Sequence, residues 1–247
     1  MPRQSAPCVR QIAGVAAIDA ALRAGADVRL VLVADDARSS ELRALLARAK
    51  ESGSSVRTAT RNVIARLSLV RPAADALALV GRDPEADLAA SLARGGAFWL
   101  LVGVAYPGNV GMVIRTAEVS GADGIAIDGK FDHAAKRAAL RTSMRADKFM
   151  PVLWTDADAV LEAARAAGHR AVALDESAER AHFAADLRGP RLFVVGGENG
   201  GIPRDLLDRC DERVRVPMAG FIPCYNLQAA VSAVAIERLR QLGLPEV

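Results

Sequence analysis

The chain has 247 residues, of which 51% are hydrophobic and 25% charged, and its formal net charge is +3 at pH 7. This composition excludes a disordered or fibrous protein and suits one large or two ordinary globular domains. No apolar run reaches the ~18 residues that a membrane span requires, and the first eleven residues lack the apolar core of a signal peptide. We therefore expect a soluble cytoplasmic protein with no membrane partner.

The cysteines and histidines are few and dispersed along the chain, with three of each. No CxxC pair is present, so the sequence predicts neither a disulfide framework nor a zinc site, and we expect no bound metal. The residues concerned are Cys8, Cys210, Cys224, His133, His169 and His182.

Positive charge is concentrated near the N-terminus. Residues 1–81 carry 12 Arg or Lys against 7 Asp or Glu, a net of +5, whereas residues 82–247 carry 20 against 22, a net of −2. Only four of the 32 basic residues are lysines. Arginine suits phosphate contacts because its planar fork makes two hydrogen bonds at once, but a GC-rich coding bias also produces an arginine excess.

Residues 1–81 alternate between the apolar spacing of helices and short strand-like runs. This alternation predicts a small α/β sandwich. Its function is either RNA docking, which the net charge favours, or a structural or dimerisation role. We predict helices over residues 11–24, 40–51 (capped by Ser39 or Ser40) and 61–67, and strands over residues 28–33, from residue 56, and over residues 76–80.

A polar segment, residues 82–96, follows with Pro84 and a closing glycine pair, and it turns helical from about Glu85. We place a linker and the domain boundary here. Beyond it, residues 97–247 again alternate, and the run FWLLVGV is typical of a buried parallel strand. We predict strands over residues 98–104, 124–127, 171–174, 192–195 and 213–216, and helices over residues 110–120 (capped by Asn109), after Pro203, and over residues 157–167 and 227–242.

Residues 130–148 hold six basic side chains against two acidic ones. Two interpretations stay open for this run. It is either a solvated helical face or an edge of the second domain that contacts phosphates.

Glycine-rich residues 196–201 (GGENGG) carry one carboxylate, Glu198. The turn has no following Lys for a phosphate loop and lacks the GxGxxG pattern of dinucleotide-binding units. Taken singly, Arg115 is a surface or a functional arginine, and Asn226 is a helix cap or a functional amide.

Three motifs together resemble the SpoU (TrmH-like) family of RNA ribose 2′-O-methyltransferases in the SPOUT superfamily. They are PGNVGMVIRTAEVSG (residues 107–121), VVGGENGGI (residues 194–202), and VPMAG (residues 216–220) followed by CYNLQAA (residues 224–230). Residues 1–81 resemble, less specifically, the L30e-like RNA-binding domain of that family. The resemblance implies an α/β fold with a deep trefoil knot, S-adenosylmethionine as cofactor, and a homodimer whose site spans two subunits.

The resemblance also implies site residues. Arg115 matches the arginine proposed to activate the ribose hydroxyl, and we favour electrostatic stabilisation of the alkoxide because a guanidinium stays charged at neutral pH. The other catalytic positions are Asn109, Glu198 and Asn226. The cofactor-binding positions are Gly196, Gly197, Val216, Met218, Tyr225 and Leu227.

The sequence departs from the family pattern at three positions. Cys224 and Tyr225 replace the usual Ser-Leu pair, and Arg145 stands where glycine is common. We expect methylation of ribosomal RNA, because the minimal tRNA enzymes of the family lack the N-terminal domain. The alternatives are a tRNA methyltransferase and a non-catalytic RNA-binding or ribosome-assembly protein.

Overall fold

The computed structural model describes residues 11–197, 200–222 and 224–243. The chain divides into two compact units, Met1–Asp83 and Pro84–Val247. Among the described residues, no helix is both long and apolar enough to cross a membrane.

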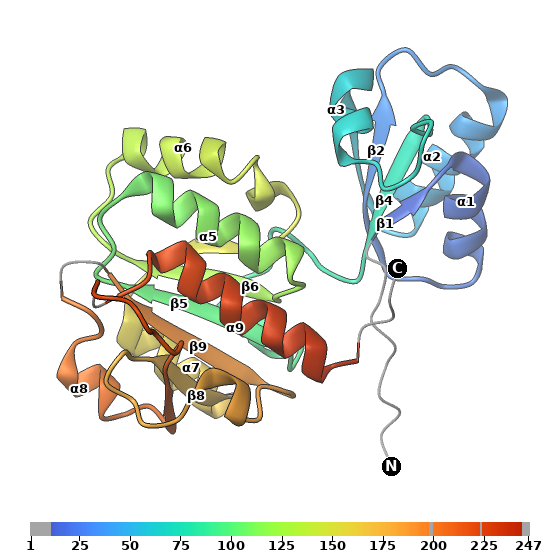
Figure 1. The fold of residues 1–247 in the computed structure, drawn as a ribbon. Helices are drawn as coiled ribbons and strands as arrows, with labels where there is room; N and C mark the ends of the chain where they lie inside the picture. Colours follow the sequence, from blue (N-terminus) through green and yellow to red (C-terminus); the bar gives the residue numbers. More distant parts are fainter. Residues whose placement is uncertain (1–10, 198–199, 223, 244–247) are drawn as a thin grey trace. The chain divides into compact units, whose positions relative to one another are not determined.

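The first unit is a mixed four-stranded sheet in the order β1-β4-β2-β3, with three helices (Figure 1). β2 and β3 are parallel, whereas β4 is antiparallel to both β1 and β2. Buried side chains from the helices and the sheet, such as Ile18, Val31 and Leu45, form a core within this unit. The elements are β1 (Gln11–Ala13), α1 (Val15–Arg23), β2 (Val28–Ala34), α2 (Ser40–Glu51), β3 (Ser55–Ala59), α3 (Arg61–Leu67) and β4 (Ala76–Val80).

The start of this unit differs from the sequence prediction. Residues 11–13 form an edge strand paired with β4, and α1 begins only after Gly14, whose φ of 98° is not helical. The helical spacing of Ile12 was misleading because a half-buried edge strand needs an apolar residue there too. The other elements predicted for this unit are confirmed, and Ser39 caps α2 by accepting a hydrogen bond from the Leu42 N–H at 3.0 Å.

The second unit is built on a parallel six-stranded sheet in the order β10-β8-β9-β5-β6-β7. The chain therefore starts in the middle at β5, moves outward to β7, and returns to the other side through β8, β9 and β10. The elements are α4 (Leu88–Leu92), β5 (Ala97–Val102), α5 (Pro107–Val119), β6 (Gly124–Asp128), α6 (His133–Thr142), the 3-10 turn η1 (Ala146–Lys148), β7 (Val152–Trp154), α7 (Ala157–Ala166), β8 (Arg170–Leu174), the 3-10 turn η2 (His182–Ala184), β9 (Arg191–Gly196), α8 (Arg204–Leu207), β10 (Glu212–Val214) and α9 (Leu227–Gln241).

Helices cover both faces of this sheet (Figure 1). Because successive strand residues point to opposite faces, Trp99 and Phe193 enter the core beneath α5 and α9, where their rings stack at 4.7 Å. Phe98 and Leu100 enter the opposite core, against α7. Every residue of β5 is buried, which is why its sequence is a continuous apolar run.

The second unit differs from the predictions in several places. α5 begins at Pro107 rather than after Asn109, since the fixed φ of proline suits the first helical position. β10 ends at Val214, not at residue 216, because its partner β8 ends opposite at Leu174. β7 was not predicted, as three residues are too few for a period-2 pattern. The helix expected from about Glu85 is α4, capped by Asp87, and its Leu92 is buried in the second unit.

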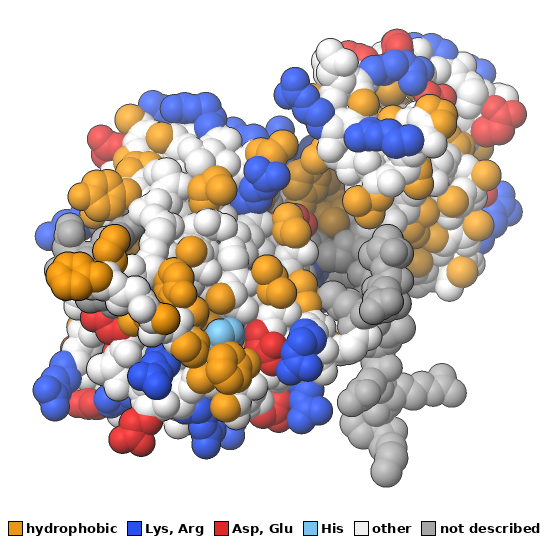
Figure 2. Space-filling model, in the orientation of Figure 1, with side chains coloured by type: hydrophobic (Ala, Val, Ile, Leu, Met, Phe, Trp, Pro, Cys, Tyr) orange, Lys and Arg blue, Asp and Glu red, His pale blue; other side chains and the backbone are white. Residues whose placement is uncertain are grey.

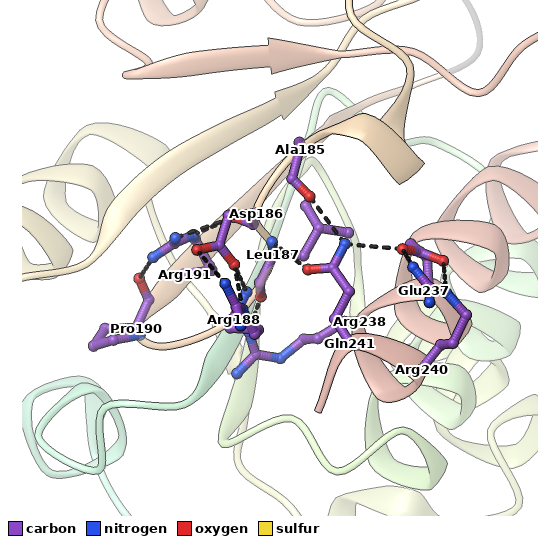
Figure 3. A network of polar contacts seen from close by, with 10 residues as sticks. All are labelled: Ala185, Asp186, Leu187, Arg188, Pro190, Arg191, Glu237, Arg238, Arg240 and Gln241. Carbon is purple, nitrogen blue, oxygen red and sulfur yellow. Dashed lines mark hydrogen bonds and ion pairs between the residues drawn. The ribbon is translucent and has the colours of Figure 1, made fainter. Parts of the chain in front are cut away.

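The C-terminal end of α9 is fixed to the segment that precedes β9 (Figure 3). The Gln241 side chain accepts a hydrogen bond from the Leu187 N–H at 2.8 Å and donates one to the Ala185 carbonyl at 2.9 Å. Arg238 donates to the Leu187 carbonyl. These contacts hold α9 against the unit from the end opposite to Asn226.

Candidate functional site

A cavity of about 620 Å³ lies where β8, β9 and β10 end and α9 begins. Ligands of open parallel sheets bind at such carboxyl ends, and the volume is typical of small-molecule sites. All six positions that the sequence suggested for cofactor binding line this cavity. The described lining residues are Leu174, Asp175, Glu176, Ser177, Val195, Gly196, Gly197, Gly200, Gly201, Ile202, Leu207, Val214, Val216, Met218, Cys224, Tyr225, Leu227 and Ala230.

The loop after β9 brings backbone against backbone. A Cβ on Gly196 would lie 2.0 Å from the Gly201 carbonyl carbon, and one on Gly197 would lie 2.2 Å from the Gly103 carbonyl oxygen. The Gly197 N–H donates to the Val102 carbonyl at 2.8 Å, and the Gly201 N–H donates to the Gly197 carbonyl at 3.0 Å. Only glycine fits at residues 196 and 197, and the resulting wall of the cavity is main chain.

The loop after β10 is held by hydrogen bonds from two directions. The Arg215 N–H donates to the Arg180 carbonyl at 2.9 Å, which ties the loop to the segment after β8. The Tyr225 hydroxyl donates to the Pro217 carbonyl at 3.2 Å. Val216 and Met218 line the cavity between these two attachments.

Asn226 joins α9 to α5. Its Oδ1 accepts a hydrogen bond from the Gln228 N–H at 2.9 Å and so caps α9. Its Nδ2 lies 3.4 Å from Oδ1 of Asn109, in the first turn of α5. Both interpretations of Asn226 therefore have a structural basis, because it is a cap and it also contacts the second predicted amide.

Of the other two predicted catalytic positions, one makes no hydrogen bond to this pair and the other is not described. Arg115 is exposed on α5, six residues after Asn109, and does not line the cavity. Glu198 lies outside the described residues. Asn109 and Asn226 are thus the two predicted catalytic positions that the structure places in contact.

The sequence analysis missed the wall of the cavity that follows β8. Asp175, Glu176 and Ser177 line it, and the Asp175 carboxylate is held by the N–H and hydroxyl of Ser177 at 2.9 to 3.0 Å. The signal was available, because a polar triplet directly follows the predicted strand over residues 171–174.

The charge of the cavity is negative in its described part. Asp175 and Glu176 are charged, whereas no Lys or Arg is found among the described lining residues. Such a site favours a ligand that carries positive charge. Within the described residues, no group of three His, Cys, Asp or Glu side chains is arranged to hold a metal ion.

Comparison with known proteins agrees with this geometry. The model of the SpoU rRNA methylase family matches residues 97–236. A 23S rRNA (guanosine-2′-O-)-methyltransferase RlmB of Xanthomonas campestris is 28% identical over 238 residues, which cover 93% of this chain and 96% of that protein.

Solved structures of SpoU methyltransferases are also similar to this chain. The SpoU methyltransferase AviRb from Streptomyces viridochromogenes has a TM-score of 0.59 and 27% identity, over 94% of this chain and 89% of that chain. Its complex with the cofactor AdoMet has a TM-score of 0.56 at 26% identity and the same coverage. A structure described for 2-OH methylation of C/U34 on tRNA has a TM-score of 0.51 and 26% identity, over 60% of this chain and 96% of that chain.

Proposed function

The chain belongs to the SpoU rRNA methylase family and is an S-adenosylmethionine-dependent RNA ribose methyltransferase, and we propose that its substrate is ribosomal RNA. Transfer to a 2′-hydroxyl of 23S ribosomal RNA is the activity named for one relative that matches almost from end to end. Two other relatives matched over 93% of this chain are named as tRNA/rRNA methyltransferases. The structure named for tRNA methylation covers only 60% of this chain although 96% of its own length is matched. This difference in coverage carries the choice of ribosomal RNA over tRNA.

The cavity suits S-adenosylmethionine in size, position and charge. The cofactor carries a sulfonium, an ammonium and a carboxylate group, so its net charge is positive, and the described charges of the wall are the carboxylates of Asp175 and Glu176. Backbone groups of Gly196, Val216 and Tyr225 would hold its adenosine. When bound, it supplies an electrophilic methyl group.

Apolar and main-chain groups complete the proposed cofactor site. Met218 and Leu227 would contact the cofactor with their side chains, and Gly197 would contact it through its backbone. Glu198 stays a proposed catalytic residue on the evidence of the motif alone.

Arg115 is proposed to stabilise the acceptor oxygen. A ribose hydroxyl is too weak an acid to lose its proton unaided, and a guanidinium beside it favours the alkoxide. Asn109 and Asn226 would orient the ribose, because their mutual hydrogen bond fixes both amides. Correct orientation of the hydroxyl supplies much of the remaining acceleration.

We propose that Arg115 performs this role in the site of a second copy. It does not line the cavity of its own chain. On α5 it shares one face with Met112 and Val119, at positions i, i+3 and i+7. These two apolar side chains are 37% and 74% exposed, and Ile236 on the adjoining α9 is 66% exposed. An apolar helix face that carries one arginine suits a homodimer in which that arginine enters the partner's site.

The variant Arg115→Ala tests the mechanism. We expect methyl incorporation into ribosomal RNA from radiolabelled S-adenosylmethionine to fall at least about a hundredfold, the size of effect seen for single electrostatic groups. Cofactor affinity, measured by calorimetry, should be unchanged. A wild-type rate in the variant would refute the role of Arg115, and labelling of tRNA instead of ribosomal RNA would refute the proposed substrate.

Mixed dimers test the shared site. Subunits carrying Arg115→Ala are combined with subunits carrying Asn226→Ala, each of which is inactive alone. If Arg115 acts across the interface, about a quarter of the wild-type activity returns, because half of the dimers are mixed and each has one intact site. If it acts within its own chain, no activity returns.

Two further features of the family are proposals for this chain. We propose, on the likeness to this family, that the chain around the cavity is threaded as a deep trefoil knot. We also propose that the first unit is an L30e-like domain that docks RNA in the cytoplasm. A crystal structure tracing residues 191–227 without threading would refute the first proposal.

A further inference from the structure

Two arginines on α6 are exposed and have no acidic partner among the described residues. Arg137 and Arg141 are one helical turn apart, so their side chains lie next to each other on one face. Within the described part of the chain, neither makes an ion pair. This face therefore carries two uncompensated positive charges.

The acidic residues nearby are already engaged. Asp132 caps α6 by accepting the Ala135 N–H at 2.7 Å, and Asp147 accepts two hydrogen bonds from Arg145 at 3.0 and 2.8 Å. Lys136 is held over the ring of Trp154 at 5.1 Å. The cations left exposed are those of the α6 surface, which we define as Lys130, Arg137, Arg141 and Lys148. Figure 2 shows Lys and Arg side chains along the edge that α6 forms.

Other exposed arginines of the second unit either form ion pairs or lie singly on separate segments. Those without an ion pair in the described chain include Arg115, Arg170, Arg204 and Arg215. Arg188 pairs with Asp186 at 2.8 Å, and Arg240 pairs with Glu237 at 2.8 Å, although both arginines are exposed. A coding bias toward arginine gives no reason for unpaired arginines to collect on one helix. Two unpaired arginines one turn apart on the same helix favour a function for the α6 surface over a merely solvated face.

The α6 surface has a fixed position relative to the proposed catalytic helix. α6 packs on α5 at Gly111, where a Cβ would lie 2.4 Å from the Ala139 carbonyl oxygen. Helices this close do not slide past each other without strain. A phosphate bound on α6 therefore lies at a set distance from Asn109 and Arg115 on α5.

We propose that the α6 surface binds backbone phosphates of the RNA substrate beside the nucleotide that is methylated. The planar guanidinium groups of Arg137 and Arg141 suit bidentate contacts with phosphate oxygens. Lys130 and Lys148, on either side of the two arginines, extend the positive surface along the RNA strand. This inference rests on the proposed function, because it requires that the substrate is RNA.

The test is the double variant Arg137→Gln, Arg141→Gln, with Arg188→Gln, Arg240→Gln as the control of equal charge. Binding of a fluorescein-labelled fragment of 23S ribosomal RNA is followed by anisotropy over a series of KCl concentrations, without cofactor. Each lost phosphate contact lowers the slope of log K against log[salt] by about 0.7 to 0.9. We expect the α6 variant to lose about 1 to 2 in slope and at least about tenfold in affinity at low salt. The control should match the wild type.

A charge-preserving variant guards against misfolding. Arg137→Lys, Arg141→Lys should keep most of the slope, and all variants should bind S-adenosylmethionine as the wild type does. A wild-type slope in the Gln variant, or an equal loss in the control, would overturn the proposal. So would binding to phosphatidylglycerol vesicles that the Gln variant loses while its RNA binding is unchanged.

Failure of the proposed function gives a different result. In that case the wild-type protein transfers no methyl group to ribosomal RNA, whereas the anisotropy measurement does not depend on transfer. Methylation by the wild type together with unaltered RNA binding by the Gln variant would refute only the role of the α6 surface.

Discussion

Asn226 and Gly197 meet different requirements of the same cavity. Asn226 supplies a side chain that caps α9 and contacts Asn109. Gly197 has no side chain, and its main chain can therefore lie close to the main chain of Gly103. One residue thus accounts for the polar contact between α9 and α5, and another for the close approach of two backbone segments.

Replacing Gly197 by alanine should therefore damage the cofactor site. The new methyl group would lie 2.2 Å from the Gly103 carbonyl oxygen. This oxygen belongs to the backbone, so the clash cannot be relieved by a change of side-chain rotamer. We expect the affinity for S-adenosylmethionine to fall at least about tenfold, or ~1.4 kcal/mol, in calorimetric titrations. Gly220→Ala is the control, since a Cβ there meets nothing within 4 Å. Equal affinities in the two variants would contradict the packing described for this loop.

At the scale of the elements, α5 and α6 depend on one small residue where they meet. A Cβ on Gly111 would lie 2.4 Å from the Ala139 carbonyl oxygen and 2.6 Å from Cβ of Thr142. Gly111→Ala should destabilise the protein by about 1 to 3 kcal/mol, the usual cost of overpacking, which outweighs the gain of up to ~1 kcal/mol in helix propensity. Urea denaturation measures the difference.

Gly108→Ala in the same helix is the matched control. A Cβ at Gly108 meets nothing within 4 Å, so this variant should be as stable as the wild type or slightly more stable. If Gly111→Ala were equally well tolerated, the two helices could not be as close as they are described.

Glu237, near the C-terminal end of α9, makes the stability of the folded protein dependent on pH. Hydrogen bonds from Arg240, and then from Gln241, lower the pKa of Glu237 from 4.5 to about 2. Because the folded pKa lies below the unfolded one, this stabilisation is complete above pH 4.5 and is lost as the pH falls toward 2. The ion pair is partly exposed to solvent, so we expect Glu237→Gln to cost about 1 kcal/mol at pH 7.

Thermal unfolding of the wild type and of Glu237→Gln over a pH series checks this expectation. The two proteins should approach each other in stability as the pH falls below 4.5 and converge near pH 2, where the folded-state carboxylate is protonated. A difference that is the same at pH 7 and at low pH would show that Glu237 acts through packing instead of charge.

At the scale of the whole molecule, the two units have separate cores. The first is built around Ile18 and Leu45, and the second around the stacked Trp99 and Phe193. We expect calorimetry to resolve two unfolding transitions. S-adenosylmethionine at 100 times its Kd should stabilise only the second unit, by about 2.7 kcal/mol. A single transition that moves as a whole with cofactor would contradict independent units.

The parts of the fold that were predictable are those with long, regular patterns. The apolar run of β5 and the helical spacing of α7 identified these elements because burial alone determines them. β1 and β7 were not predictable, since three-residue edge strands are defined by their partners in space. The cap at Asn109 was wrong because the preference of Pro107 for a first turn moved the start of α5.

The candidate site was less predictable from sequence patterns than the fold was. The cavity-lining positions between residues 196 and 227 were identified through their likeness to a family, and no spacing rule would have gathered them from three loops. Asp175 and Glu176 belong to no such motif. Their position directly after a predicted strand was a signal, but the order of the strands was needed to place them at this cavity. The position of Arg115 relative to an acceptor is not determined by one chain if the site is shared between two.

The contact between Gly197 and Gly103 joins the donor side of the enzyme to its acceptor side. One of these glycines follows β9 and borders the cavity, and the other precedes the helix that carries Asn109 and Arg115. Main chain touches main chain there, with no intervening rotamer to absorb a displacement. We therefore expect that a displacement of the loop after β9 would be passed through main-chain atoms to the segment that leads into α5.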